Sequence, residues 1–381
     1  MPKEKPKDDT AQSSPYKLET VTRACTILRE FEDDQQMLSL NDIVKRTGLE
    51  RTICFRLLHT LEQERFLRRV AGRRYAANIR LLTQKRFRIA YASQTLDSFS
   101  NAVGQGLRWA ASEHQVDLVE VGNHYSAKTA LRNADTLIKQ RVDLVIEFQV
   151  YYRIGAQLSH LFEEAGIPVI ALEIPQPGAT FFGVDNYKVG VLAGKALQQA
   201  AQRYWEGSFD ELLLLEVEIA GSLPHLRLSG AQSVLSKAPS NPFRITHLES
   251  RGEFLRSFEL TRKHLQTSPR RRTLITGIND FAVLGALRAF DEAGRRDQCL
   301  AVGLAAIPEA RQELRLPGTR LVASVGFFPE RYGTTLVRLA LDVLQHKSLP
   351  PAVYAPVELI TPQNVDRFYP KDLFPGGDQL K

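Results

Sequence analysis

Arginine and lysine side chains gather in one part of the sequence, where their chemistry is the binding of phosphate groups. Residues 1–88 contain 19 Lys and Arg against 12 Asp and Glu, whereas residues 89–381 contain 31 of each. The net charge of +7 therefore belongs to the first quarter of the chain. Between Glu64 and residue 89 there is no acid and a run of nine basic residues: Arg65, Arg68, Arg69, Arg73, Arg74, Arg80, Lys85, Arg86 and Arg88. A solvated basic face is one interpretation, but so unbalanced a run favours contacts with a polyanion.

The elements that position this basic surface begin with three predicted helices. Apolar residues three and four apart between Leu18 and Phe31 predict the first, with Val21 and Cys25 among its packing residues. Ser39 is expected to cap a second helix that ends at Gly48, a residue suited to a left-handed turn. The third, about 50–64, turns its apolar residues inward: Cys54, Leu57, Leu58 and Leu61. Short helices joined by a tight turn form a helix-turn-helix.

Two extended segments follow, 66–70 and 74–77, on either side of Ala71-Gly72-Arg73. This pattern predicts a β-hairpin with arginine at its tip, the wing of a winged helix. Residues 1–15 are rich in Lys, Asp, Ser and Pro and have few apolar groups to bury, so we expect residues 1–17 to form a disordered arm.

The stretch of about 18–82 resembles the IclR-type winged helix-turn-helix. The resemblance lies in Leu40-Asn41-Asp42-Ile43-Val44, Thr47-Gly48-Leu49-Glu50-Arg51-Thr52, Arg56-Leu57-Leu58-His59-Thr60-Leu61 and Tyr75. It implies that the helix from Glu50 enters the major groove of double-stranded DNA. The implied DNA-contacting residues are Arg51, Thr52, Phe55, Arg56 and His59 on this helix, with Arg73 and Arg74 of the wing on phosphates or in the minor groove.

Two positions in that helix depart from the family. A small hydroxyl residue is usual where Ile53 stands, and a polar residue where Phe55 stands. The alternatives to base reading are that Arg56 forms a salt bridge within the domain and that Phe55 packs against the wing.

From Phe87 onward the sequence alternates between strands and helices of 10–15 residues, which predicts parallel sheets built from βαβ units. The clearest strand segments are 88–92, 116–121, 142–146, 168–172, 212–217, 273–277 and 299–303. Sheets of this class bind ligands beyond the carboxyl ends of their strands.

The order of these segments resembles the type I periplasmic sugar-binding-protein fold, which the effector domains of the lactose-repressor family share. The resemblance covers about 87–365, and its landmarks are Ile89-Ala90-Tyr91, Asp97-Ser98-Phe99, Gly166-Ile167-Pro168-Val169-Ile170, Val184-Asp185-Asn186, Gly277-Ile278-Asn279-Asp280 and Val302-Gly303-Leu304. The sequence therefore predicts an α/β protein with a winged helix-turn-helix at 18–83 and a two-lobed unit at 84–381. Lobe 1 is expected at about 87–185 and 327–357, and lobe 2 at about 186–326 and 358–370.

The resemblance places a ligand between the lobes. The implied ligand-binding residues are Asp97, Phe99, Glu147, Gln149 and Glu173 from lobe 1, Arg227 and Asn279 from lobe 2, and Phe327 at a crossover between the lobes. Carboxylates, Arg and Asn suit a polyol, because they pair with hydroxyl groups that are costly to bury alone. Where the family often has polar residues, however, this chain reads Leu304-Ala305-Ala306 and Phe327-Phe328. The ligand is thus a sugar or another small polar molecule, with fewer hydroxyl groups or more aromatic character.

Several classes of function find no support in the sequence. There is no motif for a catalytic nucleophile, a phosphate-binding loop or a metal site, so we expect no enzyme, cofactor or metal. No apolar run approaches the roughly 18 residues of a membrane span, and the basic N-terminus leads into no apolar signal segment, so we expect a cytoplasmic protein. Cys25, Cys54 and Cys299 lie far apart and are expected to be reduced packing residues.

Together these patterns predict a transcriptional regulator that binds operator DNA as a homodimer and responds to a small-molecule effector. The resemblance implies a repressor, while the sequence itself leaves activation as an alternative. The alternative is a small-molecule-binding protein that is not secreted and whose winged helix contacts protein instead of DNA.

Overall fold

The computed structural model describes residues 18–31, 36–77, 86–95, 97–237 and 242–373, and the chain divides into two compact units, 1–86 and 87–381. The arm expected at 1–17 and the connection at 78–85 lie outside the described residues. The predicted α/β class, with a winged helix-turn-helix before a two-lobed unit, is confirmed. Among the described helices, none combines the length and the apolar character that a membrane span requires.

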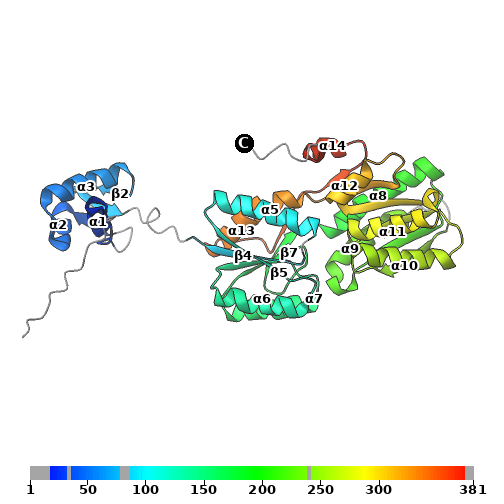
Figure 1. The fold of residues 1–381 in the computed structure, drawn as a ribbon, viewed down its shortest axis with the longest axis horizontal. Coiled ribbons are helices and arrows are strands. Elements are labelled where there is room, and N and C mark those ends of the chain that lie inside the picture. The colour runs from blue at the N-terminus through cyan, green and yellow to red at the C-terminus, as the bar shows by residue number, and fades with distance from the viewer. Residues whose placement is uncertain (1–17, 32–35, 78–85, 96, 238–241, 374–381) are drawn as a thin grey trace, which may run out of the picture. The chain divides into compact units, whose positions relative to one another are not determined.

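In the residues that the structure describes, the first unit contains helices α1, α2 and α3 (Figure 1) and a small antiparallel sheet, whose strand order is β1-β3-β2. Its elements are α1 (Glu19–Leu28), β1 (Met37–Ser39), α2 (Leu40–Thr47), α3 (Arg51–Gln63), β2 (Leu67–Val70) and β3 (Arg74–Ala77). Ser39 begins α2 through a capping box with Asp42, and Gly48 ends it at a φ of 68°. These two caps set the tight turn that leads into α3.

The core of the first unit forms where the three helices meet, around Ile27, Ile43 and Leu58. The expectation that Val21 and Cys25 pack inward is wrong, because both are exposed. Helix α1 has apolar residues on two sides, and the side with Ala24, Ile27 and Leu28 faces α2 and α3. A spacing of three and four therefore identified the helix but not which of its apolar sides is buried.

Lobe 1 of the second unit is a fully parallel sheet of order β14-β8-β7-β6-β4-β5. Its strands are β4 (Arg88–Ser93), β5 (Asp117–Gly122), β6 (Leu144–Glu147), β7 (Val169–Leu172), β8 (Thr180–Gly183) and β14 (Ala352–Tyr354). Helices α6 (Ala127–Lys139) and α7 (Tyr152–Glu164) cover one face, and α5 (Ser98–Glu113) and α13 (Tyr332–Leu344) cover the other (Figure 1).

Lobe 2 repeats this design in a sheet of order β10-β9-β11-β12-β13-β15, in which only β15 runs antiparallel to its neighbour. Its strands are β9 (Glu211–Glu216), β10 (Arg244–Glu249), β11 (Thr273–Gly277), β12 (Cys299–Ala305), β13 (Leu321–Gly326) and β15 (Glu358–Ile360). Its helices are α8 (Asn186–Trp205), α9 (Ser222–Leu235), α10 (Phe254–Thr267), α11 (Asp280–Glu292), α12 (Pro308–Leu314) and α14 (Val365–Phe368). Four short 3₁₀ turns complete the second unit, at Glu218–Ala220, Arg296–Gln298, Pro329–Arg331 and Pro370–Leu373.

The chain passes between the lobes three times, after β8, after β13 and after β14. Asp185 at the first crossing caps α8, since its carboxylate accepts a hydrogen bond from the Lys188 amide at 3.0 Å. The inner strands of both sheets are buried along almost their whole length, which explains why they read as continuous apolar runs, whereas the edge strands β5, β10, β14 and β15 are partly exposed. This layout sends the strand-end loops of both sheets toward the space between the lobes.

Candidate functional site

One face of α3 carries only exposed side chains: Arg51, Thr52, Phe55, Arg56, His59, Thr60 and Gln63. The opposite face is held in the core by Cys54, Leu57, Leu58 and Leu61. The exposed face therefore presents all five predicted α3 residues to solvent. Arg51 is the most constrained of them, because its guanidinium donates a hydrogen bond to the side-chain oxygen of Asn41 on α2.

The wing stands beside this face. The turn between β2 and β3 passes through left-handed conformations at Gly72 and Arg73, with φ values of 76° and 58°. Arg73 and Arg74 are both exposed, and the Arg69 guanidinium lies 6.0 Å from the centre of the Tyr75 ring. A groove of about 710 Å³ runs between the two elements, lined by Ser39, Leu40, Asn41, Arg51, Thr52, Phe55, Arg69, Gly72, Arg73 and Tyr75.

A second candidate site is a cavity of about 100 Å³ between the lobes of the second unit. Six predicted residues line it: Asp97, Phe99, Glu173, Arg227, Asn279 and Phe327. Loops at the carboxyl ends of both sheets supply most of its wall, as expected for parallel sheets. Four of its residues other than glycine have positive φ values, namely Tyr125, Glu173, Arg251 and Ala305. Such strain in residues other than glycine costs about 1–3 kcal/mol each and is concentrated at functional sites.

The polar centre of the cavity is an ion pair across the lobes. Arg227 donates to the Glu173 carboxylate at 2.8 Å, to the Asn186 side chain at 2.6 Å and to the Ile278 carbonyl at 2.8 Å. The other Glu173 oxygen accepts from the Tyr332 hydroxyl at 3.0 Å. Burial raises the pKa of Glu173, while Arg227 and Tyr332 act against that rise. The pair is thus satisfied within the protein and joins lobe 1 to lobe 2.

Two more cavity residues use their side chains to begin helices. The Asp97 carboxylate accepts from the Ser100 amide at 2.7 Å and caps α5, and the Asn279 oxygen accepts from the Ala282 amide at 3.0 Å and caps α11. Asn279 also donates to the Gly252 carbonyl at 3.0 Å. Burial, and then the nearby Glu309, raise the pKa of Asp97. Asp97 thus keeps hydrogen-bonding capacity for a ligand, whereas Asn279 is largely committed.

Glu147 and Gln149 do not line the cavity, although the sequence predicted that they would. Glu147 is buried and accepts from the Asn123 side chain at 2.8 Å, and burial raises its pKa to about 8. The Gln149 oxygen accepts from the Tyr151 amide at 3.0 Å. After β6 it is the apolar Phe148 and Val150 that reach the cavity. Alternate residues of an extended segment point to opposite sides, so Phe148 and Val150 face the cavity while Glu147 and Gln149 point away from it.

Apolar contacts surround the ion pair and close the space between the lobes. Ile174 of lobe 1 packs with Val217, Ala220 and Ile278 of lobe 2 in one buried cluster. At another edge the Ser98 hydroxyl of α5 donates to the Glu309 carboxylate of α12 at 2.9 Å. The two lobes are therefore in direct contact around the cavity.

Sequence comparison divides the chain as the fold does. A model of the periplasmic binding protein domain matches residues 89–348, and a model of the IclR helix-turn-helix domain matches residues 20–71. The chain belongs to the periplasmic binding protein domain family. No curated protein matches it. The joining of this domain to an IclR-type helix-turn-helix was expected from the sequence and is confirmed.

Solved structures of the same fold include solute-binding proteins of three bacteria. The protein of Actinobacillus succinogenes, with bound D-allose, is 20% identical, with a TM-score of 0.64 over 74% of this chain and 99% of its own. The protein of Agrobacterium vitis, with bound allitol, is 19% identical, and the match has a TM-score of 0.66 and covers 75% of this chain and 98% of that protein. The protein of Mycobacterium smegmatis, with bound glycerol, is 22% identical, and the match has a TM-score of 0.66 and covers 74% of this chain and 96% of that protein.

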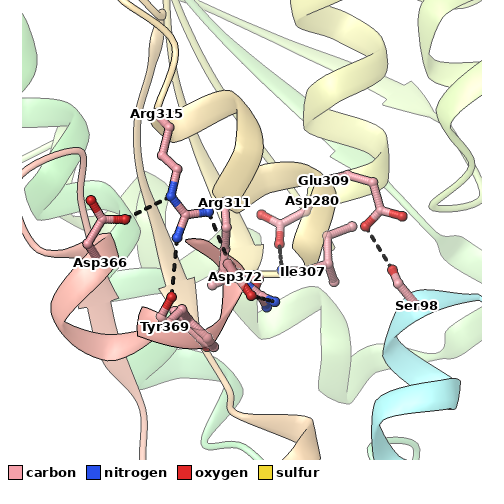
Figure 2. A network of polar contacts seen from close by, with 10 residues as sticks. Ser98, Asp280, Ile307, Glu309, Arg311, Arg315, Asp366, Tyr369 and Asp372 are labelled. Atoms are coloured by element: carbon pink, nitrogen blue, oxygen red, sulfur yellow. Dashed lines mark hydrogen bonds and ion pairs between the residues drawn. The ribbon is translucent and has the colours of Figure 1, made fainter. Parts of the chain in front are cut away.

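In this periplasmic binding protein domain, α12 connects the cavity wall to three neighbours (Figure 2). Glu309 contacts Ser98, as described. Arg311 donates to the Ala306 carbonyl at 2.8 Å and makes two hydrogen bonds, of 2.6 and 2.9 Å, with the Asp372 carboxylate near the C-terminal end of the described chain. Arg315 donates to Asp366 at 2.8 Å and to Asp372 at 3.2 Å.

Sequence reasoning missed several cavity residues. Asp280 is fully buried in the wall, accepts from the Ser324 hydroxyl at 2.7 Å and from the Ile307 amide at 3.0 Å, and its pKa is raised by burial to about 6. A Cβ atom at Gly303 would lie 2.0 Å from its carboxylate, so glycine is required there. Other missed residues lie within three positions of a strand end, and this placement could have been read from the sequence. They are Tyr125, Phe148, Ile174 and Val217.

Among the described residues, no three His, Cys, Asp or Glu side chains converge as a metal site would need.

Proposed function

We propose that this chain is a DNA-binding transcriptional regulator that responds to a sugar or a similar small polar metabolite. The observation that carries the proposal is the presence, in one chain, of an IclR-type helix-turn-helix with an exposed α3 face and of a cavity enclosed between two lobes. A DNA-binding unit joined to a ligand-binding domain of this kind is expected to couple effector concentration to operator occupancy.

The DNA side of the proposal is supported by the placement of charge. Arg56, Arg73 and Arg74 are exposed, and their guanidinium groups suit guanine edges and phosphates. We propose that the chain binds paired half-sites as a homodimer in the cytoplasm, and that it acts as a repressor, as the resemblance to the lactose-repressor family implies.

The effector side is supported by the fold and by the chemistry of the cavity wall. The structural neighbours were solved with D-allose, allitol and glycerol, all small polyhydroxyl compounds. In this chain the wall adds Phe99, Phe148 and Phe327, which favours a ligand with one apolar face and few hydroxyl groups. The cavity of about 100 Å³ is smaller than the roughly 150 Å³ that accommodates benzene in an engineered protein, so the lobes must separate to admit a sugar ring.

DNA binding is tested by selecting duplexes from a random pool with the full-length chain and measuring affinity over a range of salt concentrations. Arg56→Ala should weaken binding to the selected sequence by roughly 1–3 kcal/mol, if Arg56 contacts a base. Arg73→Ala should weaken binding to all sequences alike and flatten the salt dependence. If no sequence is enriched and affinity does not depend on salt, the DNA-binding function is wrong and a protein partner for the winged helix becomes the better explanation.

Effector binding is tested by thermal denaturation of the full-length chain with D-allose, allitol, glycerol and a wider set of metabolites. A compound that binds only the folded state raises Tm, and each tenfold increase in its concentration above Kd adds a similar further rise. The same compound should change affinity for the selected DNA. Consumption of the compound by the protein would contradict the expectation, drawn from the sequence, that the chain is not an enzyme.

A further inference from the structure

Phe55 is an apolar side chain on the most polar face of the first unit. It is 52% exposed, and its neighbours on the same face of α3 are Thr52, Arg56 and His59. The sequence left open whether Phe55 packs against the wing. With half of the side chain in solvent, such packing leaves about half of its apolar surface available to another molecule.

The surroundings of Phe55 indicate what that molecule is. Phe55 lines the groove between α3 and the wing, together with Arg51, Arg69 and Arg73. A protein surface that docks through an exposed aromatic group generally has an apolar centre, whereas this groove is bordered by guanidinium groups. Arginine beside an aromatic ring matches a polyanion that also presents apolar groups, and DNA does so in its major groove.

Only one base presents a methyl group in the major groove of DNA. The major-groove edge of thymine carries a 5-methyl group, and the other three bases show only hydrogen-bonding groups and ring C–H. Phe55 lies one turn into α3, within the part of a recognition helix that reaches base edges. We propose that Phe55 selects thymine at one position of each half-site, by contact with its 5-methyl group. This inference rests on the proposed DNA-binding function.

The test uses the full-length chain and the duplex enriched by selection. Each selected thymine is replaced in turn by deoxyuridine, which removes only the methyl group, and the affinity of each duplex is measured. For the unmodified protein, one such replacement in each half-site should weaken binding about three- to fivefold, the effect expected for one buried carbon. For Phe55→Ser, the thymine and uracil duplexes should bind equally.

Two further variants separate this contact from general effects. Phe55→Leu keeps an apolar side chain and should retain most of the preference for thymine. Val21→Ala changes another exposed apolar residue of the same unit, 56% exposed on α1, and should leave the thymine to uracil ratio unchanged. Because Phe55 is exposed, its variants should melt at the same temperature as the parent protein.

The outcomes distinguish the inference from the function on which it depends. If a sequence is enriched but no uracil replacement weakens binding, or if Phe55→Ser keeps the ratio, Phe55 does not read thymine and DNA binding stands. If no sequence is enriched and affinity does not depend on salt, both fail.

Discussion

The two units of this protein use arginine in opposite ways. In the first unit, Arg56 and Arg73 extend into solvent from α3 and the wing. In the second unit, Arg227 and Arg311 are largely withdrawn from solvent and are bonded to carboxylates and carbonyl groups of the protein. The same side chain is thus available for a partner molecule in one unit and holds the fold in the other.

The charge of each segment reflects this difference. A buried guanidinium must be paired, because an uncompensated buried charge costs several kcal/mol, and residues 89–381 contain as many acids as bases. An exposed guanidinium remains hydrated and needs no acid, so the first unit can have an excess. Four predictions sharpen this comparison, from the largest expected effect to the smallest.

Arg227→Ala should have the largest effect, since it leaves Glu173 buried without its ionic partner. Breaking a buried pair costs about 3–5 kcal/mol in the free energy of unfolding. Urea denaturation of the full-length protein measures this change. The double variant Glu173→Leu with Arg227→Met should recover much of the loss, because it removes both charges. A single variant as stable as the parent protein would show that Arg227 contributes as little to the fold as an exposed arginine.

Glu147 extends the comparison to a buried acid without a cation. Its pKa lies at about 8 in the folded protein, against an ordinary value of 4.5, so over this range the folded state holds one more proton than the unfolded state. The stability that Glu147 contributes is therefore complete below pH 4.5 and is lost as pH rises toward about 8, by several kcal/mol. Glu147→Gln keeps an acceptor for Asn123 and should flatten this dependence. If the free energy of unfolding, measured by urea denaturation, depended on pH in the same way in both proteins, Glu147 would not cause this pH dependence.

Arg311→Ala should have an intermediate effect. It removes both hydrogen bonds to Asp372 and the one to the Ala306 carbonyl, at a site that is mostly but not fully buried. We expect a loss of about 1–3 kcal/mol, typical of charge-assisted hydrogen bonds. Hydrogen exchange should show faster opening at 365–372 in the variant. Unchanged exchange in that segment would mean that Arg311 does not hold it.

Arg73→Ala should have the smallest effect on folding, within about 0.5 kcal/mol, as for most exposed positions. The thermal unfolding of the variant and of the parent protein should coincide while DNA affinity falls. A large loss of stability would erase the distinction between the two groups of arginines.

Much of the fold could be predicted from local signals. Ser39 and Gly48 mark the ends of α2 because capping depends on a few adjacent atoms, and the apolar runs of the second unit mark buried parallel strands. The same signals could not tell that Val21 lies outside the core, because α1 is apolar on more than one side and its packing partners alone select the buried one.

The residue types at the sites were also evident in the sequence, but their roles were not. The pattern of α3 was enough to separate Cys54 and Leu58 from Arg56 and His59, since helical geometry alone sorts them onto different faces. Which polar groups remain available to a ligand was decided by the tertiary structure. Arg227 and Glu173 are 54 residues apart in sequence, and only the closure of two separate sheets brings them into a buried pair that satisfies both charges.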